Sequence, residues 1–478
     1  MPTLRAALDR LDRWLETVPV LRVSGVLVLL FLLLSAIPLW LRLDLSACSL
    51  DLAIYAQAMH RMARGEWNPF LSVRHVYAFG DHVDPVVLLG APLTWVLPPA
   101  AAAILVEVSW VAAAPLPVLW LWRTGRIHGA AGVFAVGFLY FSPATNLATF
   151  NPVHPTTWAI FPMACLGAAL VAGRVPLAVG LAVFLFTFRE EFPFAGVTLA
   201  AALAWRRHGR AAAVLLVVSL AWAAVAFVVR PAMMPTEQYG GRILGRLLDP
   251  AAVLADYTRG TYQLRQMLRL AVPLAPLAVW MWRRRLVPDP VLVAPLLPLL
   301  AIRALRPAWD GHYMPVVIAG LLLAALSAMR NRARPPAWVF ALTTACCLVT
   351  NGDVLEANAR SYLTGTRRYP RDPGRLASLA RAREYLLQHD DGPVLAMANL
   401  TPGLVARRDV YQVEGSHPPG WRIFRYVFVE KLPRGDAWPI GAERYADLVR
   451  AWRAEPGTEV IIDDEHVLLA RGRFHRDR

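Results

Sequence analysis

Charged residues are scarce in this sequence, and lysine is almost missing. Charged residues make up 17% of the chain, whereas 57% of its residues are hydrophobic and the mean hydropathy is +0.43. Soluble proteins contain roughly a quarter charged residues, so this balance excludes an ordinary soluble protein and predicts a polytopic membrane protein. Lys431 is the only lysine, and the net charge of +15 therefore rests on arginine. We interpret that charge through membrane topology and expect no nucleic-acid partner.

Cysteine is also rare, and its placement excludes two common kinds of site. Cys48, Cys165, Cys346 and Cys347 are the only cysteines, and no two of them form a CxxC pair. Three of the four lie in apolar segments. The pattern indicates neither a disulfide framework nor a zinc site.

The N-terminus combines arginines with an apolar run, as a signal peptide does. The run from residue 23 to residue 40 is long enough to span a bilayer. Arg42 and Asp44 separate it from Cys48, whereas a lipoprotein cleavage site would follow the run directly. We therefore expect an uncleaved first helix, with residues 1–22 in the cytoplasm.

The apolar segments predict an α-helical polytopic protein with about eleven transmembrane helices. With residues 1–22 inside, the arginine clusters of the short loops all fall on the cytoplasmic side, as the positive-inside rule requires. The transmembrane domain then covers residues 23–350, with a first outer loop at 42–99, and residues 351–478 are extracytoplasmic. The predicted spans are 22–41, 100–122, 129–143, 156–172, 175–188, 192–205, 211–229, 266–282, 288–302, 313–329 and 336–350.

Two segments do not fit this pattern. Residues 86–97 are too short to span and contain proline, so they suit a re-entrant or interfacial helix packed on protein. The outer loop 230–265 carries arginines such as Arg242, Arg246 and Arg259 against the positive-inside bias. Either the topology changes there, or an amphipathic helix lies on the outer leaflet.

The tail predicts a small α/β domain. Helical periodicity covers 374–389, 399–408 and 441–454, and strand patterns cover 393–398, 410–413, 426–430, 459–463 and 466–470. This alternation favours a mixed or parallel sheet. The tail has no Walker or dinucleotide glycine pattern, so a docking or lid role is favoured over a nucleotide role.

Ionisable residues gather on the outer side of the predicted topology. Asp81, His82 and Asp84 precede an apolar run, and Arg189 and Glu190 lie between two short spans. A charge against a bilayer is costly unless water, a partner or a substrate compensates it, so these segments are either plain surface loops or the mouth of a site. The same side collects Asp51, His154, Glu191, Arg303, Arg306, Asp310, His312 and Tyr313.

The order of several short motifs resembles a known family. "LDLAIYAQ", "GDHVDP", "NPVHP", "FREEF", "GHY" and "NLTPGLVARRDVY" are similar to bacterial predicted membrane proteins grouped as domain-of-unknown-function family 2079. That family in turn resembles the C-type (GT-C) glycosyltransferases. The resemblance implies many helices, an acidic first outer loop, a polyprenyl-phosphate-sugar donor, a soluble outer domain and a place in the bacterial inner membrane.

The chain departs from the family pattern at three positions. Ala56 stands where an acid commonly precedes Gln57, His60 stands where an aromatic residue is usual, and Thr156 stands where a carboxylate follows the His-Pro pair. One acidic partner is therefore missing, which weighs against a scheme with two carboxylates or a bridging metal.

Asp51 is the leading candidate for a catalytic base. Its place just beyond the first helix matches the position of an essential aspartate in C-type transferases, and one carboxylate is enough because a lipid phosphate is a good leaving group. Such a base removes the acceptor proton while the sugar carbon is attacked from the opposite face, with inversion. The alternative role is a helix N-cap.

The remaining candidates each have a structural alternative. Asp81, His82 and Asp84 suit a turn, and Asp84 suits a cap. Glu190 is a second acid or part of an internal ion pair with Arg189, which would otherwise anchor a phosphate. Arg303 and Arg306 suit a phosphate or a lipid headgroup. The predicted catalytic set is Asp51, Asp81, His82 and Glu190, and the predicted substrate-binding set is Gln57, Asp84, His154, Arg189, Arg303, His312 and Tyr313.

The sequence thus favours a membrane glycosyltransferase that moves a sugar from a polyprenyl-phosphate carrier to an extracytoplasmic glycan, lipid or protein. A divalent cation, Mg²⁺ or Mn²⁺, is a further possibility, with Asp81 and Asp84 as its candidate ligands. A transporter or lipid-carrier flippase is the alternative from another class, and it would place charges near the bilayer midplane. Only Glu107, inside a span, fits that expectation. A noncatalytic scaffold is the third alternative.

Overall fold

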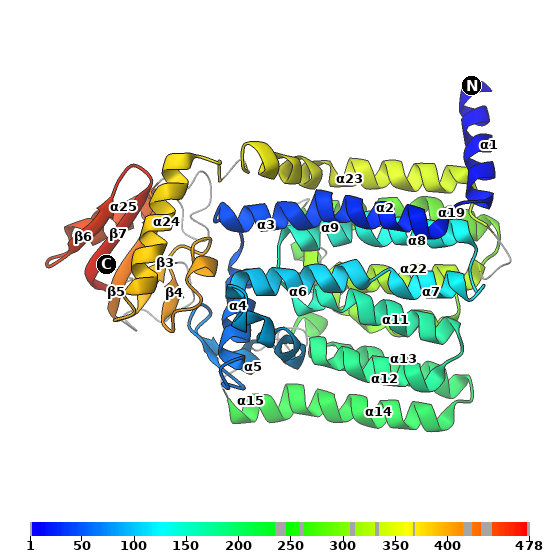
Figure 1. The fold of residues 1–478 in the computed structure, drawn as a ribbon. Coiled ribbons are helices and arrows are strands. Elements are labelled where there is room, and N and C mark those ends of the chain that lie inside the picture. Colours follow the sequence, from blue (N-terminus) through cyan, green and yellow to red (C-terminus); the bar gives the residue numbers. More distant parts are fainter. Residues whose placement is uncertain are drawn as a thin grey trace.

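Apolar helices build most of the structure, and a small sheet domain caps one end of them (Figure 1). The computed structural model describes residues 2–234, 245–258, 262–305, 311–329, 334–366, 369–413, 423–431 and 442–475. Helix α1 (Pro2–Glu16) lies at the end of the bundle opposite the sheet domain. The predicted fold class, a helical membrane protein with a C-terminal sheet domain, is confirmed.

Among the described residues, six helical segments are long and apolar enough to cross a membrane. Four shorter apolar helices accompany them, and each of the eleven predicted spans contains a helix. The long segments are α2, η1 and α3 (Val20–Phe31, Leu32–Ala36, Ile37–Asp44), α6 and α7 (Pro99–Ala113, Leu116–Arg123), α8 and α9 (Gly129–Phe141, Pro143–Phe150), α14, η5 and α15 (Gly209–Ala224, Val225–Val229, Arg230–Met233), η7 and α22 (Gly311–Tyr313, Met314–Met329), and α23 (Ala337–Leu363).

The shorter helices complete the bundle. They are α10 and α11 (Pro155–Trp158, Ile160–Val171), α12 and η4 (Val175–Leu185, Phe186–Phe188), α13 (Phe192–Trp205) and α21 (Leu296–Leu305). The remaining helices of this part are α17 (Pro250–Thr258), α18 (Tyr262–Ala271), η6 (Val272–Leu274), α19 (Ala275–Arg283) and α20 (Pro290–Val293).

The long segments differ in how much of their surface is covered. Only 28%, 22% and 28% of the most apolar stretches of 20–44, 209–233 and 337–363 are buried, against 83% and 72% for 129–150 and 311–329. Large exposed apolar faces are unusual in water, but they suit contact with the apolar tails of lipids. The bundle therefore has α8, α9 and α22 in its interior, and its outer helices present apolar side chains outward.

Helix α23 continues well beyond residue 350, where the last span was predicted to end. Asn351 donates from Nδ2 to the carbonyl oxygen of Phe141 at 2.9 Å, and Asn358 donates to that of Leu34 at 2.9 Å. Asn351 and Asn358 thus form hydrogen bonds with other helices of the bundle. Their polarity is compensated there, and the helix continues past residue 350. The chain leaves the bundle only after Leu363.

The loop 230–265 contains α15 and α17 in its described parts, and α18 begins at its end. Arg246 pairs with Asp256 there. Helix α18 exposes both Arg265 and Leu264, as an amphipathic helix does. Arg242 and Arg259 lie outside the described residues.

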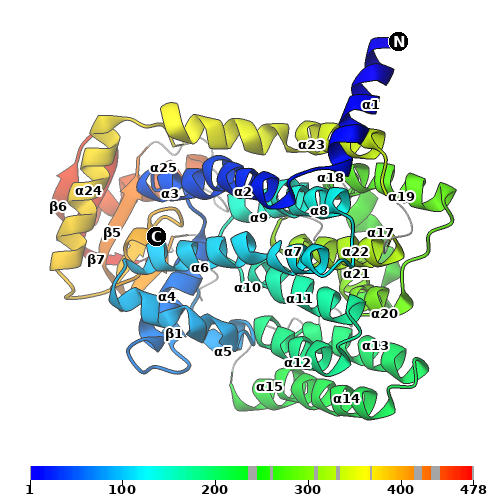
Figure 2. The same cartoon turned by 45° about the vertical axis from the view of Figure 1, so that its right-hand side comes forward.

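The first outer loop folds between the bundle and the sheet domain, as both ribbon views show (Figures 1 and 2). It contains α4 (Leu50–Met62), the antiparallel pair β1 (Phe70–Leu71) and β2 (Val76–Tyr77), and α5 (Ala78–Asp81). The re-entrant or interfacial helix predicted at 86–97 is not continuous: two short 3₁₀ helices, η2 (Pro85–Leu89) and η3 (Ala91–Trp95), lie there. Pro92 lacks the amide donor that a continuous helix would need at that position.

The sheet domain has five strands in the order β4-β3-β5-β7-β6. Strand β3 runs parallel to β4 and β5, and β7 runs antiparallel to β5 and β6, so the predicted mixed sheet is found. The helix predicted within 399–408 is found only as the single 3₁₀ turn η8 (Thr401–Gly403), because Pro402 and Gly403 disfavour a longer helix. The other elements are α24 (Pro373–Gln388), β3 (Val394–Ala396), β4 (Val410–Gln412), β5 (Ile423–Glu430), α25 (Ala442–Ala454), β6 (Glu459–Asp463) and β7 (Val467–His475).

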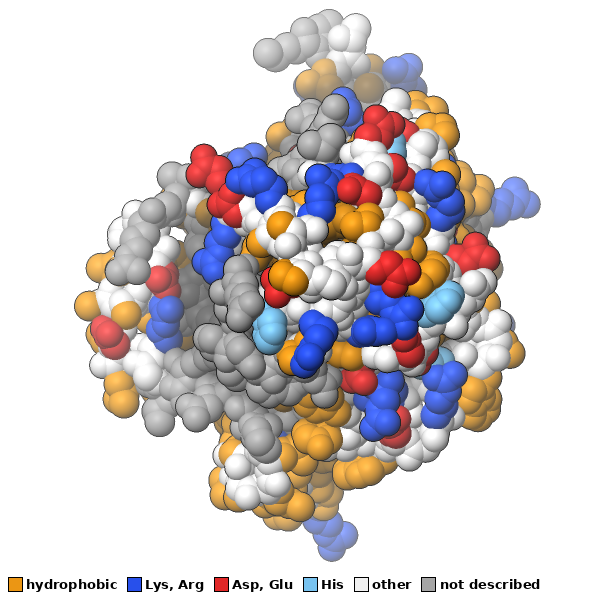
Figure 3. Space-filling model, turned by 90° about the vertical axis from the view of Figure 1, so that its left-hand side faces the viewer, with side chains coloured by type: hydrophobic (Ala, Val, Ile, Leu, Met, Phe, Trp, Pro, Cys, Tyr) orange, Lys and Arg blue, Asp and Glu red, His pale blue; other side chains and the backbone are white. Residues whose placement is uncertain are grey.

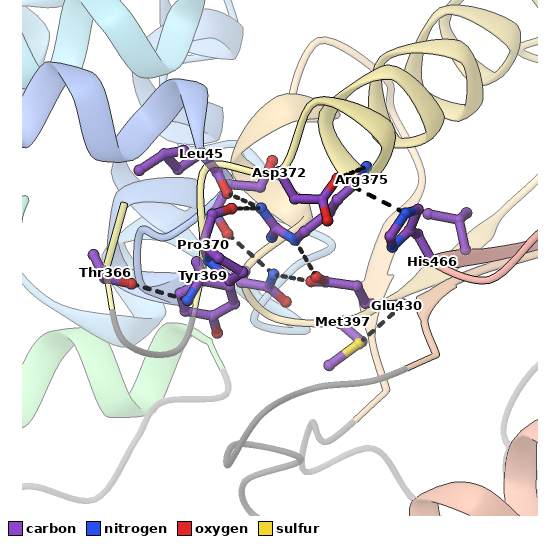
Figure 4. Close-up of polar contacts among 12 residues, drawn as sticks. Leu45, Thr366, Tyr369, Pro370, Asp372, Arg375, Met397, Glu430 and His466 are labelled. Carbon is purple, nitrogen blue, oxygen red and sulfur yellow. Dashed lines mark hydrogen bonds and ion pairs between the residues drawn. The ribbon is translucent and has the colours of Figure 1, made fainter. Parts of the chain in front are cut away.

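A buried ion pair inside the sheet domain holds the side chains that bond this domain to the end of the bundle (Figure 4). Arg375, on α24, donates from Nε to Oε1 of Glu430 at 2.5 Å and from Nη1 to the carbonyl oxygen of Leu45 at 3.0 Å. Asn399 donates from Nδ2 to the carbonyl oxygen of Ser46 at 3.0 Å and to Oε2 of Glu430 at 3.1 Å. Figure 3 views this end of the molecule, where charged side chains of both signs cover the face.

Arg375→Met should loosen the sheet domain, because it leaves the Glu430 carboxylate buried without its cation. We expect a loss of about 3–5 kcal/mol in the free energy of unfolding, measured by denaturation in detergent, and faster proteolytic release of the domain. Arg381→Met is the matched control: its side chain is 65% exposed in its pair with Asp464, and such pairs contribute about 0–1 kcal/mol. Equal losses for both variants would contradict this account.

Candidate active site

A cavity of about 550 Å³ lies between the end of the bundle and the sheet domain. It is lined by seven of the eleven residues that the sequence predicted for the site: Asp51, Asp81, His82, His154, Arg189, His312 and Tyr313. Their elements are far apart in the chain, so the fold brings them together. The rest of the wall includes Cys48, Ser49, Tyr55, Arg74, Tyr369, Ala398, Asn399 and Gln412.

Asp51 lies in the first turn of α4 and faces this cavity. Ser49, not Asp51, is the N-cap residue, and Asp51 makes no capping hydrogen bond, so the alternative role as a cap is not found. Its Oδ2 lies 3.5 Å from Nε2 of His154, and its side chain is 46% exposed. Burial opposes ionisation, but His154, Arg74 and Arg189 outweigh it and hold the pKa of Asp51 below its usual value.

His154 is fixed from three sides. Its ring stacks on that of His312 with centroids 3.5 Å apart and an interplanar angle of 5°. Its backbone amide donates to Oε2 of Glu107 at 2.8 Å, and Asp51 contacts its ring. Glu107, the one acid predicted inside a span, therefore positions the histidine loop.

Glu190 joins the first outer loop to the bundle. Its Oε1 accepts from Nδ1 of His82 at 3.0 Å, its Oε2 accepts from the amide of Val83 at 3.2 Å, and Nε of Arg189 lies 3.9 Å away. Burial opposes ionisation, but His82, Arg189 and the hydrogen bonds outweigh it and hold the pKa of Glu190 well below its usual value. Glu190 and Arg189 thus lie together as the predicted ion pair, and of these two residues Arg189 lines the cavity whereas Glu190 does not.

Arg189 and Arg303 both contact Tyr313. Arg189 donates from Nη2 to the Tyr313 hydroxyl at 3.2 Å, and the Arg303 guanidinium lies 3.7 Å from the centre of the tyrosine ring. Arg303 also pairs with Glu191 and does not line the cavity. Arg189 is therefore the cation at the wall, with Arg303 behind it; Arg306 and Asp310 lie outside the described residues.

The two aspartates proposed as metal ligands have different surroundings. Asp81 lies 3.7 Å from Nε of Arg74 and 3.8 Å from Nε2 of His82. Asp84 is buried beside the cavity, without a capping bond, and burial together with Glu190 and Asp81 raises its pKa well above its usual value despite Arg189. Among the described residues, no three or more His, Cys, Asp or Glu side chains are grouped so that they could hold a metal ion.

Gln57, predicted to bind substrate, lies away from the cavity. Its Nε2 donates to Oγ of Ser72 at 2.9 Å, and its Oε1 accepts from the amide of Val73 at 3.3 Å. Ser72 in turn accepts from the amide of Val410 at 3.1 Å and donates to the carbonyl oxygen of Arg408. Gln57 therefore helps to hold the outer loop against β4.

Several wall residues were not predicted from the sequence. Tyr55 lies one helical turn after Asp51, so helix periodicity could have indicated it. Arg74 could have been found as an arginine of the acidic outer loop. Asn399 and Gln412 reach the cavity only because the sheet domain docks there, and no local pattern indicates that.

The comparisons with known proteins agree with this fold. A family model described as "Predicted membrane protein (DUF2079)" matches residues 42–431. The chain belongs to this family. The predicted resemblance to it is therefore confirmed.

The comparison with solved structures gives two matches, both to C-type glycosyltransferases, and the first of them has a similar chain path. ArnT from Cupriavidus metallidurans, in its apo state, superposes with a TM-score of 0.52 at 13% identity, over 95% of this chain and 97% of that one. The arabinofuranosyltransferase AftD from Mycobacteria gives a TM-score of 0.46 at 15% identity, over 96% of this chain and 41% of that one. No curated protein matches the sequence. The likeness to ArnT shows that the two chains share a fold.

Glu190→Gln should destabilise the protein at neutral pH and much less in acid. The pKa of Glu190 is lowered in the folded state, so its contribution is complete above the unfolded value of about 4.3 and is lost as the pH falls through the folded value. Melting temperatures of both proteins across pH should converge below about pH 4. Glu66→Gln is the control and should change little, because the Glu66 side chain is 55% exposed and lies 3.8 Å from its partner Arg61. Equal neutral-pH stability of Glu190→Gln and wild type would refute the role of this carboxylate.

Proposed function

We propose that this protein is a membrane glycosyltransferase that moves a sugar from a polyprenyl-phosphate carrier to an acceptor outside the cytoplasm. One observation carries the proposal: an ionised carboxylate, Asp51, and a buried cation, Arg189, line the same cavity. This cavity lies at the sheet-domain end of the helical bundle, in a fold like that of ArnT. Transfer from a lipid phosphate needs these two groups, a base for the acceptor and a cation for the phosphate.

Asp51 is the proposed general base. As the acceptor oxygen bonds to the anomeric carbon, the bond from that carbon to the phosphate oxygen breaks and its electron pair stays on the phosphate. The acceptor proton passes to the Asp51 carboxylate and from there to water. Attack opposite the leaving group inverts the anomeric centre. The lowered pKa keeps Asp51 ionised at neutral pH, as a base must be.

The leaving phosphate is assigned to the cationic wall. Arg189 has a planar guanidinium suited to phosphate oxygens, and Tyr313 and Glu190 hold it in place. His312 and His154 line the same region and offer ring N–H donors. Asp81 and His82 act through their contacts with Arg74 and Glu190, so we assign them to positioning.

The location of the cavity disfavours transport. A transporter keeps its ionisable groups near the bilayer midplane, whereas these groups lie at the sheet-domain end of the bundle. We further propose that this end faces away from the cytoplasm in the inner membrane. The arginine clusters at 206–210 and 283–285 would then lie in the cytoplasm, as the positive-inside rule requires.

Asp51→Asn should abolish most of the transfer activity, although the asparagine side chain has nearly the same shape as the aspartate side chain. In vesicles with the purified chain and a panel of polyprenyl-phosphate-linked sugars, we expect release of polyprenyl phosphate to fall about 10²–10⁴-fold. The acid limb of the wild-type rate should lie below about pH 4, because the pKa of Asp51 is lowered. Asp44→Asn, exposed at the end of α3, is the matched control and should keep the wild-type rate. Full activity of Asp51→Asn would show that another residue is the base.

A further inference from the structure

The two walls of the cavity differ in charge. The bundle and outer loop contribute Asp51, Asp81, Arg74, Arg189 and three histidines. Among the described residues beyond residue 363, the wall residues are Tyr369, Ala398, Asn399 and Gln412, and none of these four is charged. The cavity therefore presents an ionic wall and, across from it, a neutral wall with two amides.

Gln412 is the clearest polar group of the neutral wall. It ends β4, an edge strand of the sheet, and is 7% exposed, with the cavity as its surroundings. The described residues provide no hydrogen-bond partner for its side-chain amide. Its amide can therefore form hydrogen bonds with a ligand that enters the cavity.

The backbone around Gln412 is held firmly. Val410 donates its amide to Oγ of Ser72 at 3.1 Å, and Val413 donates its amide to the carbonyl oxygen of Ala396 at 2.9 Å. Both bonds fix the end of β4 relative to the outer loop and the neighbouring strand. The Gln412 amide is therefore presented to the cavity from a fixed main chain.

Asn399 adds a second fixed amide. Its Nδ2 is occupied by the carbonyl oxygen of Ser46 and by Glu430, at 3.0 and 3.1 Å. These bonds set the orientation of the amide, and its Oδ1 has no donor among the described residues. Asn399 is 7% exposed and lines the cavity, so this oxygen is available as an acceptor.

We propose that this neutral wall is the acceptor subsite and that Gln412 and Asn399 select an uncharged, hydroxyl-bearing acceptor such as a glycoside. An amide both donates to and accepts from hydroxyl groups, and a site built this way rejects ligands that lack them. A phosphorylated or carboxylated acceptor would need a cation, and the described residues of this wall supply none. This inference rests on the proposed transferase function and assigns the remaining half of its cavity.

Steady-state kinetics of the full chain in vesicles test the assignment. The probes are a polyprenyl-phosphate-linked sugar as donor and methyl glycosides, or the matching glycosyl phosphates, as acceptors. For Gln412→Ala and the similarly sized Gln412→Met, the KM for the methyl glycoside should rise about tenfold to a hundredfold, with a smaller change in kcat. Gln388→Ala is the control, since Gln388 lies on α24 of the same domain, bonds Glu384 and is remote from the cavity.

Three kinetic results would overturn the assignment. One is an unchanged KM for the methyl glycoside in both Gln412 variants. Another is transfer to glycosyl phosphates in preference to methyl glycosides. The third is a loss in kcat as large as the rise in KM, which would indicate a structural role.

A wild-type chain that consumes no donor would refute the transferase function, and binding then decides the subsite. Thermal unfolding of the full chain with methyl glycosides alone should show stabilisation of the wild type and of Gln388→Ala, but not of Gln412→Met. An absence of stabilisation in the wild type would overturn the subsite as well.

Discussion

The site depends on the contacts of the Glu190 carboxylate, because this one group joins two parts of the chain. It bonds His82 and the amide of Val83 in the first outer loop, and it lies beside Arg189 at the end of the bundle. A buried charge is stable only when paired and hydrogen-bonded, so the loop and the bundle end stabilise each other. Through this contact the outer loop is held where Asp81 and His82 form the cavity wall.

The membrane sets the place of these charges. Hydrocarbon cannot hydrogen-bond, so polar groups inside the bundle bond one another or main-chain carbonyls, as Asn351 and Asn358 do. Glu107 follows the same rule by accepting from the amide of His154. The ionisable groups of the cavity lie instead at the end of the bundle, under the sheet domain. There they are sheltered enough to act strongly on one another and close enough to water to be ionised.

Much of this arrangement could be predicted from local composition. Apolar runs indicated the helices, since length and hydropathy are local properties, and the alternation of helix and strand indicated a mixed sheet. Counting spans predicted that Asp51, His82, His154 and Arg189 share one side of the membrane, and the structure places all four at one cavity.

Other features depend on contacts that no local pattern records. The bonds of Asn351 and Asn358 extend α23 past the predicted end of the last span. Gln57 lies in an otherwise plausible motif, but its partner is Ser72 in the outer loop, not a ligand. Asn399 and Gln412 belong to the cavity only because a separate domain folds over it.

The docking of the sheet domain uses main-chain acceptors on the side of the bundle and outer loop. Arg375 and Asn399 donate to the carbonyl oxygens of Leu45 and Ser46. A carbonyl oxygen is present whatever side chain the residue carries, so substitutions at these two positions leave the acceptors in place. These two contacts therefore tolerate sequence change on the bundle side, whereas the contacts of Ser72 with Val410 and Arg408 depend on its side chain. Of the two wall amides, Asn399 also attaches the domain, so Gln412 is the one that can vary without the loss of a docking bond.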